Sequence, residues 1–201
     1  MQPYLQASEI IDWHHPAVAE LAQTIAAKQQ TPIAIAQACF EWVRDEIRHS
    51  SDYSLNPVTC SASEVLEYKT GFCYAKSHLL AALLRANQIP AGFCYQRLMA
   101  DEAGKQFCLH GFNAVYLPEF GWYRVDARGD RVTASGREGI STRFMPPHEQ
   151  LAYPADQPGE ADFREVFAEP LAIVVNALQT HRTLEEILQN LPDRPLESVT
   201  A

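Results

Sequence analysis

The sequence predicts an α+β fold, in which N-terminal helices pack on an antiparallel β-sheet. Two observations lead to this prediction. Apolar residues recur at helical spacing up to about residue 86, and beyond Pro90 the pattern changes to short, aromatic-rich runs typical of strands. Helical and strand-like patterns therefore occupy successive parts of the chain instead of alternating, which favours α+β over a parallel α/β sheet.

Four helices are expected before Pro90, at residues 16–28, 32 to about 47, 63–69 and about 73–86. Thr31 is a favourable N-cap for the second helix, because proline follows it at the first helical position. Ser61 and Glu64 have the spacing of a capping box, which predicts the start of the third. Residues 49–57 are interpreted as a loop.

Three strands are predicted at residues 91–99, 107–117 and 122–128, joined by turns at 101–105 and 118–121. Short turns between successive strands indicate an antiparallel meander. Residues 129–168 have weak periodicity and are expected to wrap the surface, and two short helices are predicted at 170–179 and 183–190. Without an evident repeat or linker, the sequence predicts a single domain over residues 1–201.

Composition narrows the class of protein. Sixteen basic residues against twenty-five acidic ones give a net charge of −9, which argues against nucleic acid as a partner. No apolar run of about 18 residues predicts a membrane span, and residues 1–15 do not have the pattern of a signal peptide. Together with an odd number of cysteines, five, these features predict reduced thiols and a cytoplasmic location.

Cys73 has the position best suited to a nucleophile. It lies in "GFC" at the predicted start of a helix, where unpaired backbone N–H groups and the helix dipole favour a thiolate. Gly71 is expected to let the chain turn sharply before it. The backbone N–H of Cys73 would stabilise a tetrahedral oxyanion. No second donor is predicted, because Trp42 lies on a helix face that is expected to belong to the core.

His110 and Asp126 are the predicted partners of Cys73, as base and orienting carboxylate. They lie 16 residues apart on neighbouring predicted strands. In an antiparallel pair, facing residues have a constant sum of numbers, and only an even sum puts both side chains on one face. A sum of 238 would set His110 opposite Arg128 and place Asp126 diagonally from it. The hypothesis therefore requires an odd-length loop around residues 117–121, or one bulge.

The remaining candidates have simpler interpretations. His78 follows Cys73 by five residues, which is not the same helix face, so it is expected to be structural or at the rim of a cleft. Cys108 and His110 share a strand face, but the sequence lacks four ligands at zinc spacing. The His49–Asp52 segment is interpreted as loop capping. The cysteines expected to fill the core are Cys39, Cys60, Cys94 and Cys108.

Three segments together resemble the transglutaminase-like superfamily, in its bacterial branch described as cysteine proteases. They are "GFCYAKSHLLAALLRANQIPAGF", "HGFNAVYL" and "GWYRVDAR". The resemblance covers about residues 31–130, which leaves 131–201 as a C-terminal extension. It implies a papain-like α+β core with Cys73 as nucleophile, His110 as general base and acid, and Asp126 as orienting carboxylate. The chain departs from the family pattern after His110, with Phe112 instead of tryptophan, and after Asp126.

The resemblance implies a thiol acyl-transfer enzyme, and we expect a cysteine peptidase or amidase that hydrolyses an amide bond. Transfer to an amine, as in a protein-glutamine transglutaminase, is the alternative within the same chemistry. A catalytically inactive binding or scaffold module with the same fold is the alternative outside it. No cofactor or metal is expected, calcium included, and the expected partner is a peptide or another amide-containing substrate.

Overall fold

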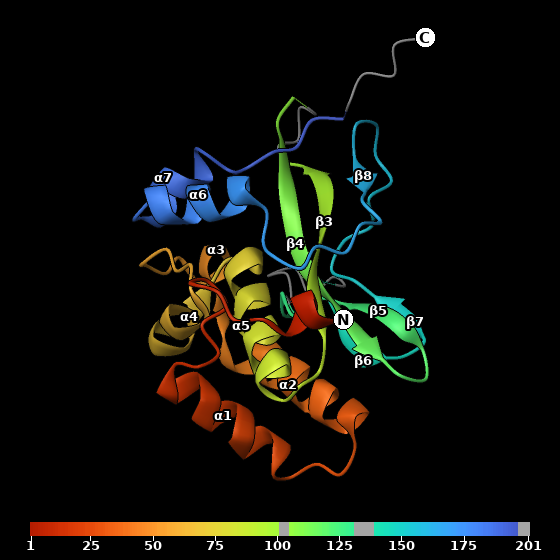
Figure 1. The fold of residues 1–201 in the computed structure, drawn as a ribbon. Helices are drawn as coiled ribbons and strands as arrows, with labels where there is room; N and C mark the ends of the chain where they lie inside the picture. Colours follow the sequence, from red (N-terminus) through yellow and green to blue (C-terminus); the bar gives the residue numbers. More distant parts are fainter. Residues whose placement is uncertain (101–104, 131–138, 197–201) are drawn as a thin grey trace.

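The protein has an α+β fold in which N-terminal helices pack on an antiparallel sheet, as predicted (Figure 1). The computed structural model describes residues 1–100, 105–130 and 139–196. The helices are α1 (Pro16–Ala26), α2 (Pro32–Glu46), α3 (Ser50–Tyr53), α4 (Ala62–Tyr68), α5 (Cys73–Ala86), α6 (Ala172–Thr180) and α7 (Leu184–Leu188), with a 3-10 turn at Gln2–Leu5. Thr31 caps α2 as predicted, and the capping box at Ser61 is formed.

The main sheet has four antiparallel strands in the order β5-β4-β3-β8. Their bounds are β3 (Ala91–Met99), β4 (Phe107–Leu117), β5 (Gly121–Val125) and β8 (Ala161–Asp162). Two smaller pairs accompany it: the parallel pair β1 (Arg48–His49) with β2 (Thr70–Gly71), and the antiparallel pair β6 (Arg143–Met145) with β7 (His148–Gln150). The predicted meander is therefore present and gains a fourth strand.

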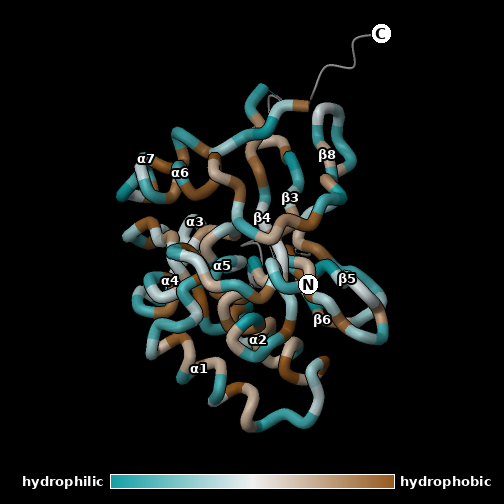
Figure 2. Tube along the Cα trace, in the orientation of Figure 1, coloured by the Kyte–Doolittle hydropathy of each residue, from teal (hydrophilic) through white to brown (hydrophobic). Residues whose placement is uncertain are grey.

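Helix α5 lies at the centre of the molecule, between the other N-terminal helices and the sheet (Figure 1). All of its residues except Ala86 are buried, including the polar or charged Lys76, Ser77, His78 and Arg85. It packs against α1, α2 and α4 on one side and against β3 and β4 on the other. The connection from α1 to α2, by contrast, is hydrophilic and lies at the edge of the molecule (Figure 2).

The β4–β5 register has the parity that the site hypothesis requires. Leu117 faces Gly121, so facing residues sum to 238 and the loop between them has three residues. The predicted third strand was too long, because β5 ends at Val125 instead of residue 128. After Val125, the Asp126 side chain accepts a hydrogen bond from the backbone N–H of Arg128 at 2.9 Å. This contact forms a local turn, in place of further pairing between β4 and β5.

Two predicted loops contain regular structure. The segment 49–57 includes α3, and part of 129–168 forms the β6–β7 hairpin and β8. Both were missed because the elements have two to four residues, too few to show a period. The predicted turn at 101–105 lies mostly outside the described residues. The two C-terminal helices were predicted correctly, including the capping box at Thr183.

Candidate active site

Cys73 is the first residue of α5, and no side chain caps this helix end. The N-cap residue is Phe72, so the backbone N–H groups of the first turn remain available to a negative charge. Gly71 does not supply the sharp turn that we predicted, because it lies in β2. A Cβ there would lie 3.1 Å from the Cβ of Ala75 and 3.3 Å from Oγ1 of Thr59, so glycine provides room for close packing.

Two contacts attach the first turns of α5 to β4, one on each side of His110. The hydroxyl of Tyr74 donates to the backbone carbonyl of Leu109. The hydroxyl of Ser77 lies between two carbonyl oxygens, that of Cys73 at 2.7 Å and that of Gly111 at 3.2 Å. β5 does not pair with this part of β4, because the pairing between the two strands begins only at Asn113. The helix end that carries Cys73 is thus fixed beside His110.

His110 and Asp126 form a buried hydrogen bond, with Nε2 2.7 Å from Oδ2. His110 is 4% exposed and Asp126 1% exposed. Two backbone N–H groups also donate to the Asp126 carboxylate, Arg128 at 2.9 Å and Ala152 at 3.0 Å. Because Nε2 is occupied, Nδ1 is the imidazole nitrogen left for the thiol. The carboxylate therefore fixes both the position and the orientation of the imidazole.

The electrostatics of this pair favour an imidazolium. Burial opposes the charge on His110, but the Asp126 carboxylate, the nearby Cys73 and hydrogen bonds to both together raise the pKa of His110 to about 10. Burial likewise opposes the charge on Asp126, and the imidazole with two backbone N–H groups holds the pKa of this carboxyl below its usual value. The arrangement can stabilise a thiolate at Cys73 through the neighbouring positive charge.

The other four cysteines differ from Cys73 in their environment. Burial raises the pKa of each thiol to about 12, which keeps them protonated at neutral pH. Cys39, Cys60 and Cys94 lie in the interior, as predicted. Cys108 was predicted to fill the core, but it is only half-buried and lines the same cleft as Cys73. His78 is fully buried and bonds to the carbonyl of Cys60 at 2.7 Å, away from the cleft.

Cys73 and His110 line a cleft of about 390 Å³. Its walls are largely apolar, and part of them comes from the C-terminal segment, which supplies Leu188 and Leu191. This segment is attached to the sheet, because the N–H of Leu109 donates to the carbonyl of Pro192 at 2.7 Å. The remaining lining residues are His49, Ser51, Phe72, Tyr74, Leu98, Met99, Ala100, Cys108, Leu109, Arg128, Tyr153, Pro154 and Glu160.

A buried ion pair supports the His110–Asp126 pair from behind. The guanidinium of Arg128 binds both oxygens of Asp52, at 2.5 and 2.8 Å, and donates to the hydroxyl of Tyr153 at 2.8 Å. The ring of Tyr153 meets His110 edge-on, with ring centroids 4.9 Å apart. Neither Asp52, which was interpreted as loop capping, nor Tyr153 was predicted to belong to the site. Residues 49–52 and 126–128 are far apart in the sequence, and no sequence pattern indicated that these two segments pack together.

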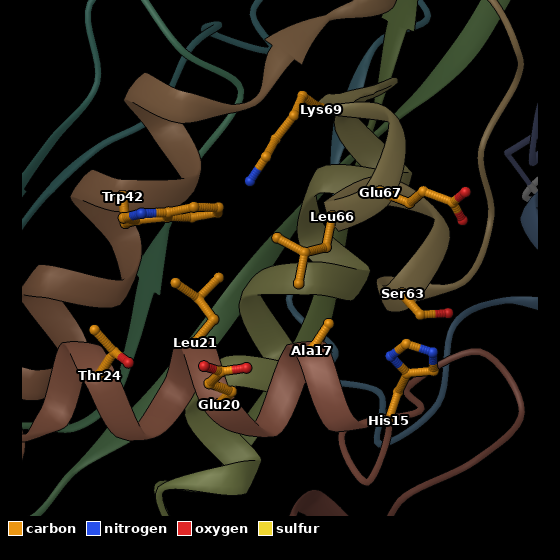
Figure 3. A pocket seen from close by; sticks show the side chains of 10 residues that line it. All are labelled: His15, Ala17, Glu20, Leu21, Thr24, Trp42, Ser63, Leu66, Glu67 and Lys69. Carbon is orange, nitrogen blue, oxygen red and sulfur yellow. The ribbon is translucent and has the colours of Figure 1, made fainter.

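A larger cavity of about 550 Å³ lies elsewhere, between α1, α2 and α4 (Figure 3). Trp42 and Leu66 point into it, and the ammonium of Lys69 lies 4.5 Å from the centre of the Trp42 ring. Its lining contains no cysteine, and its charged side chains are exposed. Trp42 therefore belongs to this groove and cannot reach an acyl group at Cys73. Cys73 and His110 line the smaller cleft instead.

No group of three or more His, Cys, Asp or Glu side chains is arranged to hold a metal ion within the described ranges. Among the helices of those ranges, none is long and apolar enough to cross a bilayer.

A helix that starts at a cysteine and packs on an antiparallel sheet bearing a His–Asp pair defines the papain-like class of thiol proteins. A family model described as "Transglutaminase-like superfamily" matches residues 19–127. The chain therefore belongs to the transglutaminase-like superfamily, as the sequence motifs predicted. The members of this superfamily are in general enzymes.

A solved structure with the same fold supports this assignment. A structure described as a "putative cysteine protease" from Cytophaga hutchinsonii is 23% identical, with a TM-score of 0.52. The similarity covers 63% of this chain and 41% of that one. The periplasmic domain of TgpA from Pseudomonas aeruginosa is 25% identical, with a TM-score of 0.45, and the match covers 62% of this chain and 45% of that one. The chain thus spans less than half of either structure. No curated protein matches it.

Proposed function

We propose that the protein is a cysteine peptidase or amidase that hydrolyses an amide bond through an acyl-enzyme. The observation that supports this best is the buried 2.7 Å hydrogen bond between His110 and Asp126 in the cleft that Cys73 lines. Cys73 is the nucleophile, His110 the general base and acid, and Asp126 the residue that orients the imidazole. These are the roles of a Cys–His–Asp triad.

The reaction follows from this geometry. The Cys73 thiolate attacks the amide carbon, and the electron pair of the carbonyl moves to oxygen, which the N–H groups at the start of α5 stabilise. His110 gives its proton to the leaving nitrogen as the C–N bond breaks. A water molecule then loses a proton to His110 and attacks the thioester, the C–S bond breaks, and the acid is released. The Cys73 thiolate and the protonated His110 are thereby restored.

The cleft supports a peptide-like substrate with an apolar acyl side. Leu98, Leu188 and Leu191 lie among its walls. Glu160 is the acidic residue among the described lining side chains, and its carboxylate already accepts the backbone N–H groups of Met99, Asp156 and Gln157. This carboxylate is therefore not available to hold an acceptor amine. We infer hydrolysis in preference to transfer to an amine.

Labelling of the intact protein with a mild thiol electrophile at neutral pH tests the triad. Selective modification of Cys73 that is lost in His110→Ala is the expected result. Equal and slow labelling of all five cysteines would instead indicate a scaffold without turnover. Incubation with a glutamine-containing peptide and a tagged amine tests the reaction type. Incorporation of the tag would show a transglutaminase and overturn hydrolysis.

A further inference from the structure

The tetrahedral oxyanion formed at Cys73 requires more than one hydrogen-bond donor. The start of α5 supplies backbone N–H groups, so a second donor must come from another element that reaches the cleft. Two lining side chains with an N–H or O–H group have other roles: the Tyr74 hydroxyl is bonded to β4, and His110 is the proposed base. The other described lining residues with such a group are His49, Ser51, Arg128 and Tyr153.

Three of these four side chains already form polar contacts with one another or with neighbouring residues. Each guanidinium nitrogen of Arg128 already donates, to Asp52 or to the Tyr153 hydroxyl. The Tyr153 hydroxyl accepts one of these hydrogen bonds, and the ring of Tyr153 meets the ring of His110 edge-on. The Ser51 hydroxyl lies 3.0 Å from Nδ1 of His49 and is paired with it. Of the four, we single out His49, because its strand pairs with the residues directly before Cys73.

The backbone places His49 next to the nucleophile. His49 of β1 pairs with Gly71 of β2, two residues before Cys73. Its ring meets the ring of Phe72 edge-on, with centroids 5.8 Å apart. The ammonium of Lys76, one turn into α5, also donates to the carbonyl of Ile47 and so ties the start of β1 to the same helix. A strand pair, a ring contact and a buried ammonium therefore hold His49 beside the start of α5.

The imidazole of His49 has one nitrogen free to act. Nδ1 is paired with Ser51, and among the described residues nothing forms a hydrogen bond with Nε2. The residue is 8% exposed and lines the cleft, so this nitrogen is not sealed in the core. When the Ser51 hydroxyl donates to Nδ1, the ring proton resides on Nε2, the nitrogen left for a ligand.

The surroundings keep this imidazole neutral. Burial and the Arg128 guanidinium lower the pKa of His49 to about 3, and Lys76 and His110 act in the same direction against the opposing carboxylate of Asp52. A neutral imidazole donates a hydrogen bond without giving up a proton at neutral pH. It would therefore stabilise an oxyanion while leaving proton transfer to His110.

We propose that the Nε2–H of His49 is the second oxyanion donor and acts together with the backbone N–H of Cys73. This inference rests on the proposed acyl-transfer function. When the thiolate adds to the carbonyl carbon, the oxygen receives the C=O electron pair and accepts both hydrogen bonds. When the intermediate collapses, that pair re-forms C=O, the C–N or C–O bond breaks, and His49 has neither gained nor lost a proton.

Acylation by a panel of N-acetyl amino-acid p-nitrophenyl esters, followed by the burst of nitrophenolate, tests the proposal. His49→Phe keeps a ring against Phe72 but removes the donor, and should lower the acylation rate by about 10²- to 10³-fold. His49→Gln restores an N–H donor and should recover much of that loss. His148→Phe, at an exposed histidine, is the matched control and should acylate at the wild-type rate.

A second readout separates a donor from a structural residue. Methyl methanethiosulfonate reacts with the Cys73 thiolate at sulfur and forms no oxyanion, so His49→Phe should leave its rate within about twofold. An unchanged acylation rate in His49→Phe would overturn the proposal. So would an equal loss of thiosulfonate labelling, because His49 would then act on the thiolate. If no ester acylates the wild-type protein, the proposed function itself fails, and this inference with it.

Discussion

Gly111 of β4 and Tyr74 of α5 pack so closely that a Cβ at position 111 would lie 2.8 Å from Cδ1 of the tyrosine. The ring cannot easily move away, because its hydroxyl is bonded to the carbonyl of Leu109. It also follows Cys73 directly in the helix, so a shift of Tyr74 carries the nucleophile with it. Gly111 thus sets the distance between the cysteine helix and the strand that bears His110.

Gly111→Ala should therefore separate Cys73 from His110. We expect a loss of about 1–3 kcal/mol in the free energy of unfolding from overpacking, together with slower alkylation of Cys73 at neutral pH. Urea unfolding and rates from intact mass measure the two effects. Gly121→Ala is the control, since its φ of +75° adds strain while nothing lies within 4 Å of the new Cβ. It should lose stability and keep the alkylation rate. Equal alkylation rates in both variants would contradict the role of Gly111.

The site residues could be predicted because the sequence carries their spacing. Cys73 lies at a helix start, and the sequence grouped His110 with Asp126 as its partners. The sequence left their register open, because the predicted four-residue turn at 118–121 would put the two side chains on opposite faces. The observed three-residue loop gives the required parity. The residues around them could not be predicted. Asp52 and Tyr153 approach Arg128 from short, aperiodic segments, and only tertiary packing brings those segments together.

The same limit applies to the cleft. Its C-terminal wall depends on the contact between Leu109 and Pro192, residues 83 positions apart, from 109 to 192. Residues 191–193 pack against the edge of β4 that β5 leaves unpaired, and no local sequence pattern predicts this contact. Helices and strands of nine or more residues were found by their period, but β6, β7 and β8 have two or three residues each.

The stability contributed by the His110–Asp126 pair should depend on pH. The pKa of His110 is raised from its usual value of 6.5 to about 10, so its contribution is complete below pH 6.5 and is lost as the pH rises towards 10. The pKa of Asp126 is lowered from 3.8, so its contribution is complete above pH 3.8 and is lost as the pH falls through the lowered value. Both contributions are therefore complete between pH 3.8 and pH 6.5.

His110→Gln tests this dependence through the difference in free energy of unfolding between the wild-type protein and the variant. Other titrating groups, such as Lys76, remain in both proteins, so their effects cancel in this difference. The loss in free energy of unfolding should be largest between about pH 3.8 and 6.5 and should shrink towards pH 10. Urea unfolding at pH 5, 7 and 9 provides the comparison, with the exposed His148→Gln as control for the loss of a histidine. A difference that grows from pH 5 to pH 9 would mean that folding lowers the pKa of His110.

Arg128→Lys should be costly although it preserves charge. Lysine cannot bind both oxygens of Asp52 and the Tyr153 hydroxyl at once. We expect a loss of about 3–5 kcal/mol in stability, typical of breaking a buried pair. The matched control is Arg124→Lys, since the guanidinium of Arg124 likewise binds two partners, Glu149 and Asp162, but these are more exposed, and it should lose less. If thermal and urea unfolding gave equal losses for both variants, the Arg128 network would be no more than a surface pair.

Leu191→Asn should change which electrophiles Cys73 prefers. Leu191 and Leu188 form the C-terminal wall of the cleft, so the wild-type protein should react faster with N-acetyl-leucine chloromethyl ketone than with iodoacetamide. An uncharged polar residue of similar size removes apolar contact without repelling the thiolate, and should lower the ratio of the two rates by roughly tenfold. The control is Leu196→Asn, at a side chain that is 46% exposed and outside the cleft lining. A ratio that stays constant in Leu191→Asn would mean that the acyl group binds along another wall. A parallel fall in both rates would instead place the effect on the thiolate, and the ratio distinguishes the two outcomes without knowledge of the natural substrate.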